Sequence, residues 1–297
     1  MTEFAQQLIN GLAFGSIYAL IALGYTMVYG VLRFINFAHS DIFMVGAFCG
    51  FYYSKWIGTG TILQALAITG LSMLTCAMLG IITERLAYRP LRSRSKLIVL
   101  ITAIGVSLLL EYAGQLIFGT NPKPFPELIK VHKYALPGGL FLNSTEIVIV
   151  LVAVSLLVAL QWIVHRTKLG TAMRAISFNY DAASLMGVNN DVVISFTFGL
   201  GSALAAAGGI LYAMNYPSID PLMGVMPGLK AFVAAVLGGI GNIPGAALGG
   251  LVIGIIETFV KGSRFSTYTD AIAFAILILM LLFKPSGLLG KTRIEKV

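Results

Sequence analysis

The sequence predicts an all-α membrane protein, a polytopic helix bundle that crosses the bilayer many times. Of its 297 residues, 58% are hydrophobic and only 11% are charged, and the mean hydropathy is +0.89. A soluble protein carries about 25% charged residues, so this composition is typical of a chain embedded in lipid. The apolar residues also fall into runs of about twenty, the length that one membrane-spanning helix needs.

Nine such runs follow one another along the chain. The seventh and eighth are rich in glycine and are separated by Gly241-Asn242-Ile243-Pro244-Gly245, and the seventh is short for a full crossing. We therefore expect about eight or nine transmembrane elements, some of them broken or re-entrant, in a single membrane domain over residues 1–297. The runs cover roughly residues 8–31, 34–54, 61–83, 97–118, 146–165, 191–214, 227–241, 245–260 and 268–284.

Basic residues indicate the orientation, because loops that stay in the cytoplasm are enriched in lysine and arginine. They gather at 85–96, at 166–174 and at the C-terminus, where Lys284, Lys291, Arg293 and Lys296 lie. The loop at 119–145 then lies outside. Nine crossings place the N-terminus outside and the C-terminus inside; a re-entrant hairpin at 227–260 would give seven crossings and the same orientation.

The sequence contains none of the common catalytic or metal-binding motifs. HExxH, GxSxG and the GxxxxGK[ST] phosphate-binding loop do not occur, and the three histidines are scattered. Cys49 and Cys76 lack the CxxC spacing of zinc or redox sites. The net charge of +8 sits in short loops rather than in a basic patch with aromatics, which argues against a nucleic-acid partner. We expect no enzyme activity, metal or bound cofactor in this chain.

The segment 166–190 is a polar interval between two apolar runs. It is predicted to form an amphipathic helix or a pair of helices that stays outside the lipid, because charges at the bilayer centre are costly. Its apolar face is expected to contact either a partner surface or the surface of the membrane itself. The residues that recur at helical spacing on this face are Leu169, Met173, Ile176, Tyr180, Ala183 and Gly187.

Polar side chains inside apolar runs are candidates for a translocation path, because burying them without a purpose is expensive. Near the start of the second run, we expect Asn36, His39 and Ser40 to share a helical face, with Asp41 beside it. They could line a path or hold a broken helix together, or they could simply cap a span at the interface. The weaker path candidates are Tyr18, Tyr25 and Asn242.

Four further acids in or beside the runs have structural interpretations. Glu111 and Glu257 lie within runs, where either could pair with a base such as Lys230 or Lys261, and pairing is at least as good an interpretation as a substrate role. Asp191 and Asp270 lie at the starts of runs, where a carboxylate is predicted to cap the helix N-terminus.

Five stretches, taken together and in order, resemble the LivH-type permease subunits of bacterial branched-chain amino acid ABC importers. Ser40-Asp41 departs from the Gly-Glu more often found in these permeases, which leaves the substrate preference open. Urea permeases are near relatives, although the INFAH start is closer to the amino acid branch. The five stretches are SIYALIALGYTMVYG (16–30), INFAHSDIFMVGA (35–47), AASLMGV (182–188), AAVLGGIGNIPGAALGG (234–250) and LLFKPSGLLG (281–290).

The resemblance implies the fold of a type II ABC-importer permease in the bacterial inner membrane. A second, LivM-like permease would pair with this chain, two cytoplasmic ATPases would bind ATP and Mg²⁺, and a periplasmic binding protein would deliver the substrate. A cytoplasmic coupling helix within 166–190 would fit a groove on the ATPase. By resemblance, its residues are Arg174, Asp181, Ala182, Ala183, Ser184, Leu185, Met186 and Gly187.

A channel or secondary transporter that works without an ATPase is the competing hypothesis. It would require a paired pore motif or matched broken helices that carry charge in the two halves of the chain. Such a carrier would also need an ion or proton site, for which Glu111 and Glu257 are the candidates.

Overall fold

The computed structural model describes residues 2–92, 94–137 and 139–290. The basic residues Lys291, Arg293 and Lys296 therefore lie outside the described residues. Each of the nine apolar runs contains one α-helix, as predicted. In the described part of the chain, these helices are α1 (Thr2–Leu32), α2 (His39–Ile57), α3 (Ile62–Thr83), α4 (Lys96–Phe118), α5 (Ser144–Arg166), α8 (Asn190–Asn215), α9 (Val225–Gly238), α10 (Ile243–Lys261) and α11 (Thr269–Phe283).

Seven helical segments of the described chain are long and apolar enough to cross a membrane. The prediction of a polytopic helical membrane protein is therefore confirmed. The two apolar helices outside this set are α2, which carries Asp41 and Lys55, and α9, which has only 14 residues. The seven segments are Thr2–Leu32, Ile62–Leu91, Lys96–Phe118, Ser144–Arg166, Asn190–Asn215, Ile243–Lys261 and Ser266–Phe283.

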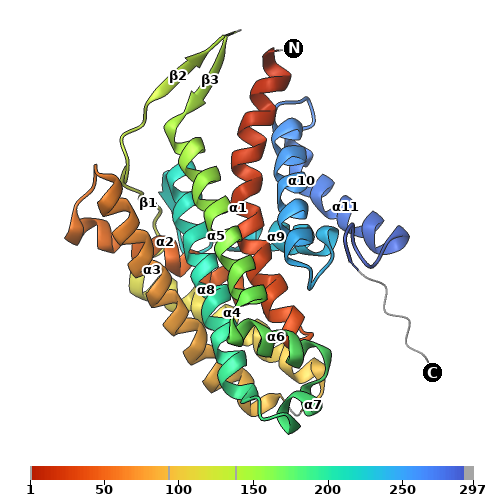
Figure 1. Cartoon of the computed structure of the whole chain (residues 1–297). Helices are drawn as coiled ribbons and strands as arrows, with labels where there is room; N and C mark the ends of the chain where they lie inside the picture. Colours follow the sequence, from red (N-terminus) through yellow and green to blue (C-terminus); the bar gives the residue numbers. More distant parts are fainter. Residues whose placement is uncertain (1, 93, 138, 291–297) are drawn as a thin grey trace.

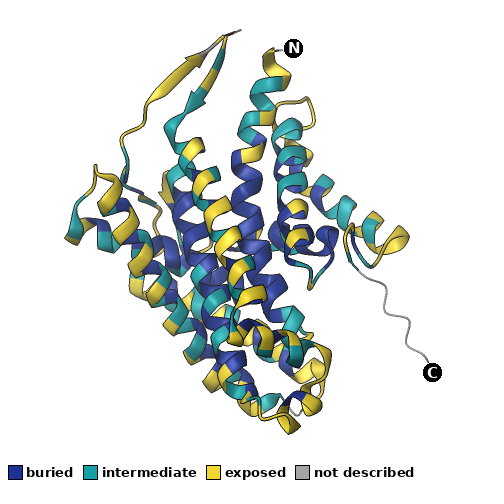
Figure 2. Ribbon diagram, viewed as in Figure 1, coloured by how far each residue is buried: buried dark blue, intermediate teal, exposed yellow. Residues whose placement is uncertain are grey.

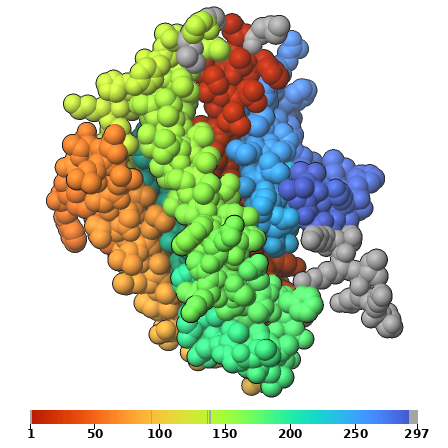
Figure 3. Space-filling model, viewed as in Figure 1, coloured from red at the N-terminus to blue at the C-terminus, as the bar shows by residue number. Residues whose placement is uncertain are grey.

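Helix α1 forms the centre of the bundle. It contacts α8, α9 and α5, and it packs most extensively along α10. Figure 2 shows the buried residues concentrated on α1, α8, α9 and α10, while α3 and α11 expose much of their surface. Figure 3 shows α5 and α10 flanking and covering the middle of α1. The exposed side chains of the outer helices are mostly apolar, as expected for a surface in contact with lipid.

Small residues allow α1 and α10 to approach closely. A Cβ atom added at Gly254 would overlap the Cα of Gly15, and one added at Gly250 would overlap Ala19. Gly11 and Gly15 on α1 and Gly250 and Gly254 on α10 have the GxxxG-like spacing that lets two helix backbones approach closely.

Short elements cover the two ends of the bundle. A hairpin of β2 (Lys133–Leu136) and β3 (Leu140–Asn143) extends beyond the helices at the end where the N-terminus lies (Figure 1). A second small sheet pairs β1 (Lys123–Pro124) with β4 (Ser218–Ile219). At the opposite end lie α6 (Lys168–Phe178) and α7 (Tyr180–Leu185) (Figure 1). The loop 119–145 and the segment 166–190 thus lie at opposite ends of the bundle. None of the four strands was predicted.

The start of α2 differs from the prediction. The second run was expected to be helical from residue 34, with Asn36 and Ser40 on one face, but the helix begins at His39. Asn36 therefore lies in the non-helical connection after α1, and the expectation of a shared helical face is wrong. The backbone leaves the helical conformation at Arg33, whose φ is 54°, and in the connection that follows Tyr88 donates a 2.6 Å hydrogen bond to Asn36 Oδ1.

Candidate coupling surface and translocation path

Helices α6 and α7 form a compact pair because each begins at a side-chain cap. The hydroxyl of Thr167 accepts a 3.0 Å hydrogen bond from the Gly170 backbone amide at the start of α6. Asn179 separates the two helices, and its Oδ1 accepts 3.0 Å bonds from the amides of Asp181 and Ala182. These bonds satisfy backbone donors that a helix N-terminus leaves free. The prediction of an amphipathic helix or helix pair within 166–190 is confirmed.

Gly187 ends α7 with a left-handed turn. Its φ is 82°, a conformation that glycine adopts without strain. The amide of Val188 bonds to the carbonyl of Ala183, and the amide of Gly187 bonds to that of Ser184, which together form a Schellman motif. Substituting Gly187 would therefore disturb the backbone as well as the surface.

Part of the apolar face of the pair packs against the helix bundle. Met173, Ile176 and Ala183 are buried. Leu185 and Met186 point the other way and are 88% and 84% exposed. Half of the predicted face thus holds the pair against the bundle, while its other members, Leu169, Tyr180 and Gly187, are exposed. Leu185 and Met186 add an outward apolar surface that lies off the predicted face. The remaining predicted coupling residues, Arg174, Asp181, Ala182, Ser184 and Gly187, are exposed.

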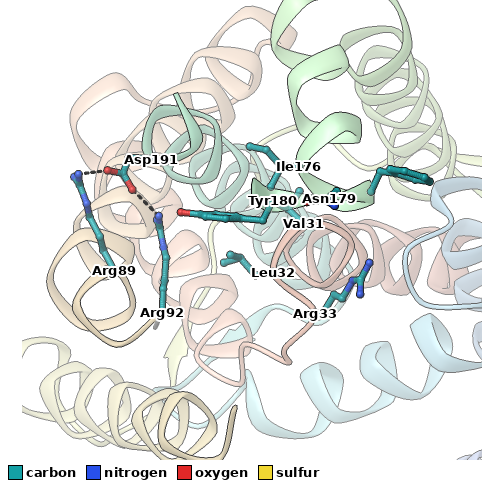
Figure 4. Close-up of a pocket in the computed structure, with 10 residues that line it drawn as sticks. Val31, Leu32, Arg33, Arg89, Arg92, Ile176, Asn179, Tyr180 and Asp191 are labelled. Carbon is teal, nitrogen blue, oxygen red and sulfur yellow. Dashed lines mark hydrogen bonds and ion pairs between the residues drawn. The ribbon is translucent and has the colours of Figure 1, made fainter. Parts of the chain in front are cut away.

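A hollow of about 690 Å³ separates α7 from the ends of α1, α8 and the short helix η2 (Arg89–Leu91) (Figure 4). Tyr180 reaches across it toward Arg92 and Asp191, while Arg33 lies on its other side. The residues that line it are Val31, Leu32, Arg33, Arg89, Arg92, Ile176, Phe178, Asn179, Tyr180 and Asp191.

An ion-pair network closes one wall of this hollow. Asp191 pairs with Arg89 and, at 2.8 Å, with Arg92. Arg92 also pairs with Glu84, a fully buried carboxylate that accepts a 2.5 Å bond from the Ser195 hydroxyl. Burial lowers the pKa of Arg92, and the neighbouring Asp191 opposes that shift. The network joins α8 to the helical extension of α3.

The sequence had suggested that Asp191 caps α8, and that interpretation is wrong. The side chain of Asn189 accepts the bond from the Val192 amide, and Asp191 is occupied by the two arginines. Asp270 likewise forms a 2.6 Å ion pair with Lys230. The residue before α11 is Tyr268, which makes no side-chain capping bond. The Glu84 cluster was missed, although a carboxylate at the end of an apolar run followed by arginines could have indicated it.

The candidate path residues fall into three places rather than one. Tyr25, His39, Ser40 and Asp41 lie together in the interior where α1 meets the first turn of α2. The rings of Tyr25 and His39 lie edge to face with their centroids 4.8 Å apart, and Asp41 accepts a 2.5 Å bond from the Ser107 hydroxyl of α4. His39 packs against Gly24, where an added Cβ would overlap its ring.

Tyr18 and Asn242 lie outside this group and form hydrogen bonds with other residues. The Tyr18 hydroxyl donates a 2.7 Å bond to Glu257. Asn242 caps α10 by accepting a 3.1 Å bond from the Gly245 amide, and its Nδ2 donates to the carbonyl of Leu289 at 2.7 Å. Among the described residues, no group of three or more histidine, cysteine or acidic side chains is placed to hold a metal ion.

Similar proteins identify the family. The profile of the family described as branched-chain amino acid transport system / permease component matches residues 7–281. The chain is 42% identical to the branched-chain amino acid permease BraD of Pseudomonas aeruginosa, over 99% of this chain and 98% of BraD. It is 41% identical to LivH of Escherichia coli K12 over the same shares, and 29% identical to the probable LivH of Methanocaldococcus jannaschii over 95% and 91%. This chain therefore belongs to the family of branched-chain amino acid transport system permease components.

Proposed function

We propose that this chain carries branched-chain or other neutral amino acids across the bacterial inner membrane as the permease subunit of an ATP-driven importer. The observation that carries the proposal is the 42% identity to BraD over 99% of the chain, because a match of that extent includes every helix of the bundle. BraD and LivH are both named as permeases of high-affinity branched-chain amino acid transport systems.

The energy for transport comes from partner chains in this proposal. No phosphate-binding loop occurs in the sequence, so two ATPase subunits hold the ATP and Mg²⁺. A LivM-like permease completes the membrane part, and a periplasmic binding protein delivers the substrate at the end that bears the β2–β3 hairpin. The α6–α7 end, with its basic loops, then lies in the cytoplasm.

The pair α6–α7 is the proposed contact with the ATPase. Leu185 and Met186 project from it, and large apolar side chains exposed to water favour a partner surface. The other exposed residues of the proposed contact are Arg174, Asp181, Ala182, Ser184 and Gly187, whereas Ala183 supports the contact by packing on the bundle. ATP-driven closure of the ATPases would displace this pair and switch the path from outward- to inward-facing.

The proposed path passes the broken start of α2, where Asn36, His39, Ser40 and Asp41 lie, with Tyr25 beside them. Discontinuous helices with polar side chains at mid-depth are typical of substrate sites in transporters. Ser40 lies directly against the first turn of α9, where a Cβ added at Gly228 would overlap it. Tyr18 and Asn242 are included as path residues at either side of this region.

The decisive experiment is affinity purification in mild detergent followed by reconstitution in liposomes. We expect an ATPase and a second permease to copurify. Uptake of leucine, isoleucine or valine should require internal ATP and external binding protein, and urea should not compete. Recovery of the chain alone, or uptake that persists without ATP but collapses with the ion gradient, would contradict the proposal and favour a secondary transporter.

The ATPase contact has its own test in Leu185→Asp and Met186→Asp. Both side chains are exposed, so these substitutions should leave folding and insertion intact while lowering ATPase copurification and uptake. Buried Ala183 is unsuitable, because Asp there would also disrupt packing. Tyr134→Asp, on the hairpin at the end of the bundle opposite to the proposed ATPase contact, is the matched control for an added surface charge in the copurification assay. Normal copurification of both Asp variants would rule out this surface.

A further inference from the structure

Arg33 occupies a backbone conformation that its side chain disfavours. Its φ is 54°, and it is the single non-glycine residue with positive φ in the described part of the chain. The left-handed position after a helix is usually filled by glycine or asparagine, because a Cβ atom clashes there with the following carbonyl. An arginine at the end of α1 therefore indicates that its side chain has a role that glycine could not fill.

The side chain of Arg33 reaches α6. Its Nη2 donates a 3.2 Å hydrogen bond to the carbonyl of Ser177, in the last turn of that helix. A cation at this place also interacts favourably with the negative end of the helix dipole. Arg33 thus joins the end of the central helix α1 to the helix pair that is proposed to meet the ATPase.

The chain that follows Arg33 leads straight to the proposed path. Residues 33–38 connect α1 to α2 without helical structure, and Asn36 within them is held by Tyr88. His39, Ser40 and Asp41 come next and form the buried first turn of α2. A displacement of α6 that pulls on Arg33 would therefore act on the segment that positions these side chains.

The hollow beside α7 leaves room for such a displacement. About 690 Å³ lies between α7 and the ends of α1 and α8, and Arg33 lies on its rim, opposite Arg89, Arg92 and Asp191 (Figure 4). A packed interior resists rearrangement, whereas a hollow allows one element to move without displacing many side chains.

We propose that Arg33 is a positioning residue for transport, which transmits the displacement of α6–α7 to residues 33–41. The inference rests on the proposed function, since it requires an ATPase that acts on α6–α7. Arg33 has no contact with substrate in this mechanism. Its guanidinium holds two parts of the permease together while they move.

The test uses the complete transporter in liposomes and measures ATP hydrolysis and amino acid uptake side by side. Arg33→Gly removes the guanidinium and also relieves the backbone. We expect assembly and ATP hydrolysis like the wild type, a Tm no lower, and uptake per ATP lower by about tenfold, an effect within reach of a residue that couples two sites. Arg85→Ala, at an exposed arginine in the helical extension of α3, should leave uptake per ATP unchanged.

Two further variants separate transmission from folding. Arg33→Ala keeps the strained backbone, and its uptake per ATP should fall as it does in Arg33→Gly. Arg33→Lys keeps a cation at this position, and its uptake per ATP should lie between those of Arg33→Ala and the wild type. Normal uptake per ATP in Arg33→Gly overturns the inference, as does a loss of assembly in both the Gly and Ala variants, which would make the role structural. If uptake by the wild-type transporter did not depend on ATP, the proposed function would be overturned instead.

Discussion

Glu257 connects three helices through one buried carboxylate. It accepts the Tyr18 hydroxyl from α1 at 2.7 Å and the ammonium of Lys230 from α9 at 2.9 Å, and Lys261 of its own helix adds a third bond at 2.9 Å. Lys230 continues the network to Asp270 on α11. A buried charge is tolerated only when it is paired and hydrogen-bonded, and this site meets that condition.

Tyr18→Phe is predicted to lower the stability of the permease. The substitution removes one hydrogen bond to a charged carboxylate, which contributes about 1.5–3 kcal/mol. Thermal unfolding of the purified complex measures the loss, and Tyr112→Phe, at an exposed tyrosine of α4, is the control. If Tyr18 acts only as a support for Glu257, the KM for uptake stays unchanged. A large change in KM with normal stability would instead support the proposal that Tyr18 is a residue of the substrate path.

The partners of single residues were predictable where opposite charges lie in apolar runs. Glu257 was expected to pair with Lys230 or Lys261 because an unpaired charge there is costly, and it pairs with both. Asp191 was predicted to cap α8 because it lies at the start of an apolar run. Its arginines lie about a hundred residues earlier, at 89 and 92, and only the folded chain brings them into contact.

At the scale of elements, the apolar runs predicted nine helices of the described chain because hydropathy is a local property, and seven of these helices lie in segments long and apolar enough to cross a membrane. Helical spacing identified one apolar face of α6–α7, but it did not show what covers that face. Met173, on the face, is buried against the bundle, whereas Tyr180, also on the face, is exposed. Asn36, in the connection before α2, likewise bonds to Tyr88, which lies 52 residues away along the chain.

Helix α7 is predicted to depend on its N-terminal cap. The helix has only six residues, and Asn179 accepts bonds from two of its first amides. Asn179→Ala should cost about 1 kcal/mol of local stability and increase fraying. Hydrogen exchange at the amides of residues 181–186 would measure this, together with ATPase copurification. Asn179→Asp keeps the acceptor and should behave like the wild type; equal protection in the Ala variant would show that packing alone holds α7.

At the scale of the whole molecule, α1 links the two ends of the transporter. Its 31 residues span about 46 Å, which exceeds the hydrocarbon core of about 30 Å. Near one end, Gln6 exchanges two hydrogen bonds with the backbone of Phe141 in the β2–β3 hairpin. Past the other end, Arg33 binds the last turn of α6. A rigid central helix that contacts both the hairpin and the helix pair can pass a displacement from one end of the molecule to the other.

That rigidity depends on the close packing of α1 against α10, which predicts opposite outcomes for two glycines. Gly254 faces Gly15, and an added Cβ would overlap its backbone, whereas Gly70 on α3 has open space around it. Gly254→Ala should destabilise the complex by about 1–3 kcal/mol because the two helices must separate. Gly70→Ala should have little effect or raise stability by up to about 1 kcal/mol, since alanine favours the helix. Thermal unfolding and uptake assays on both variants test this prediction. A Gly254→Ala permease as stable and active as Gly70→Ala would mean that α1 and α10 can separate freely, and the two ends of the molecule could not then be linked through α1.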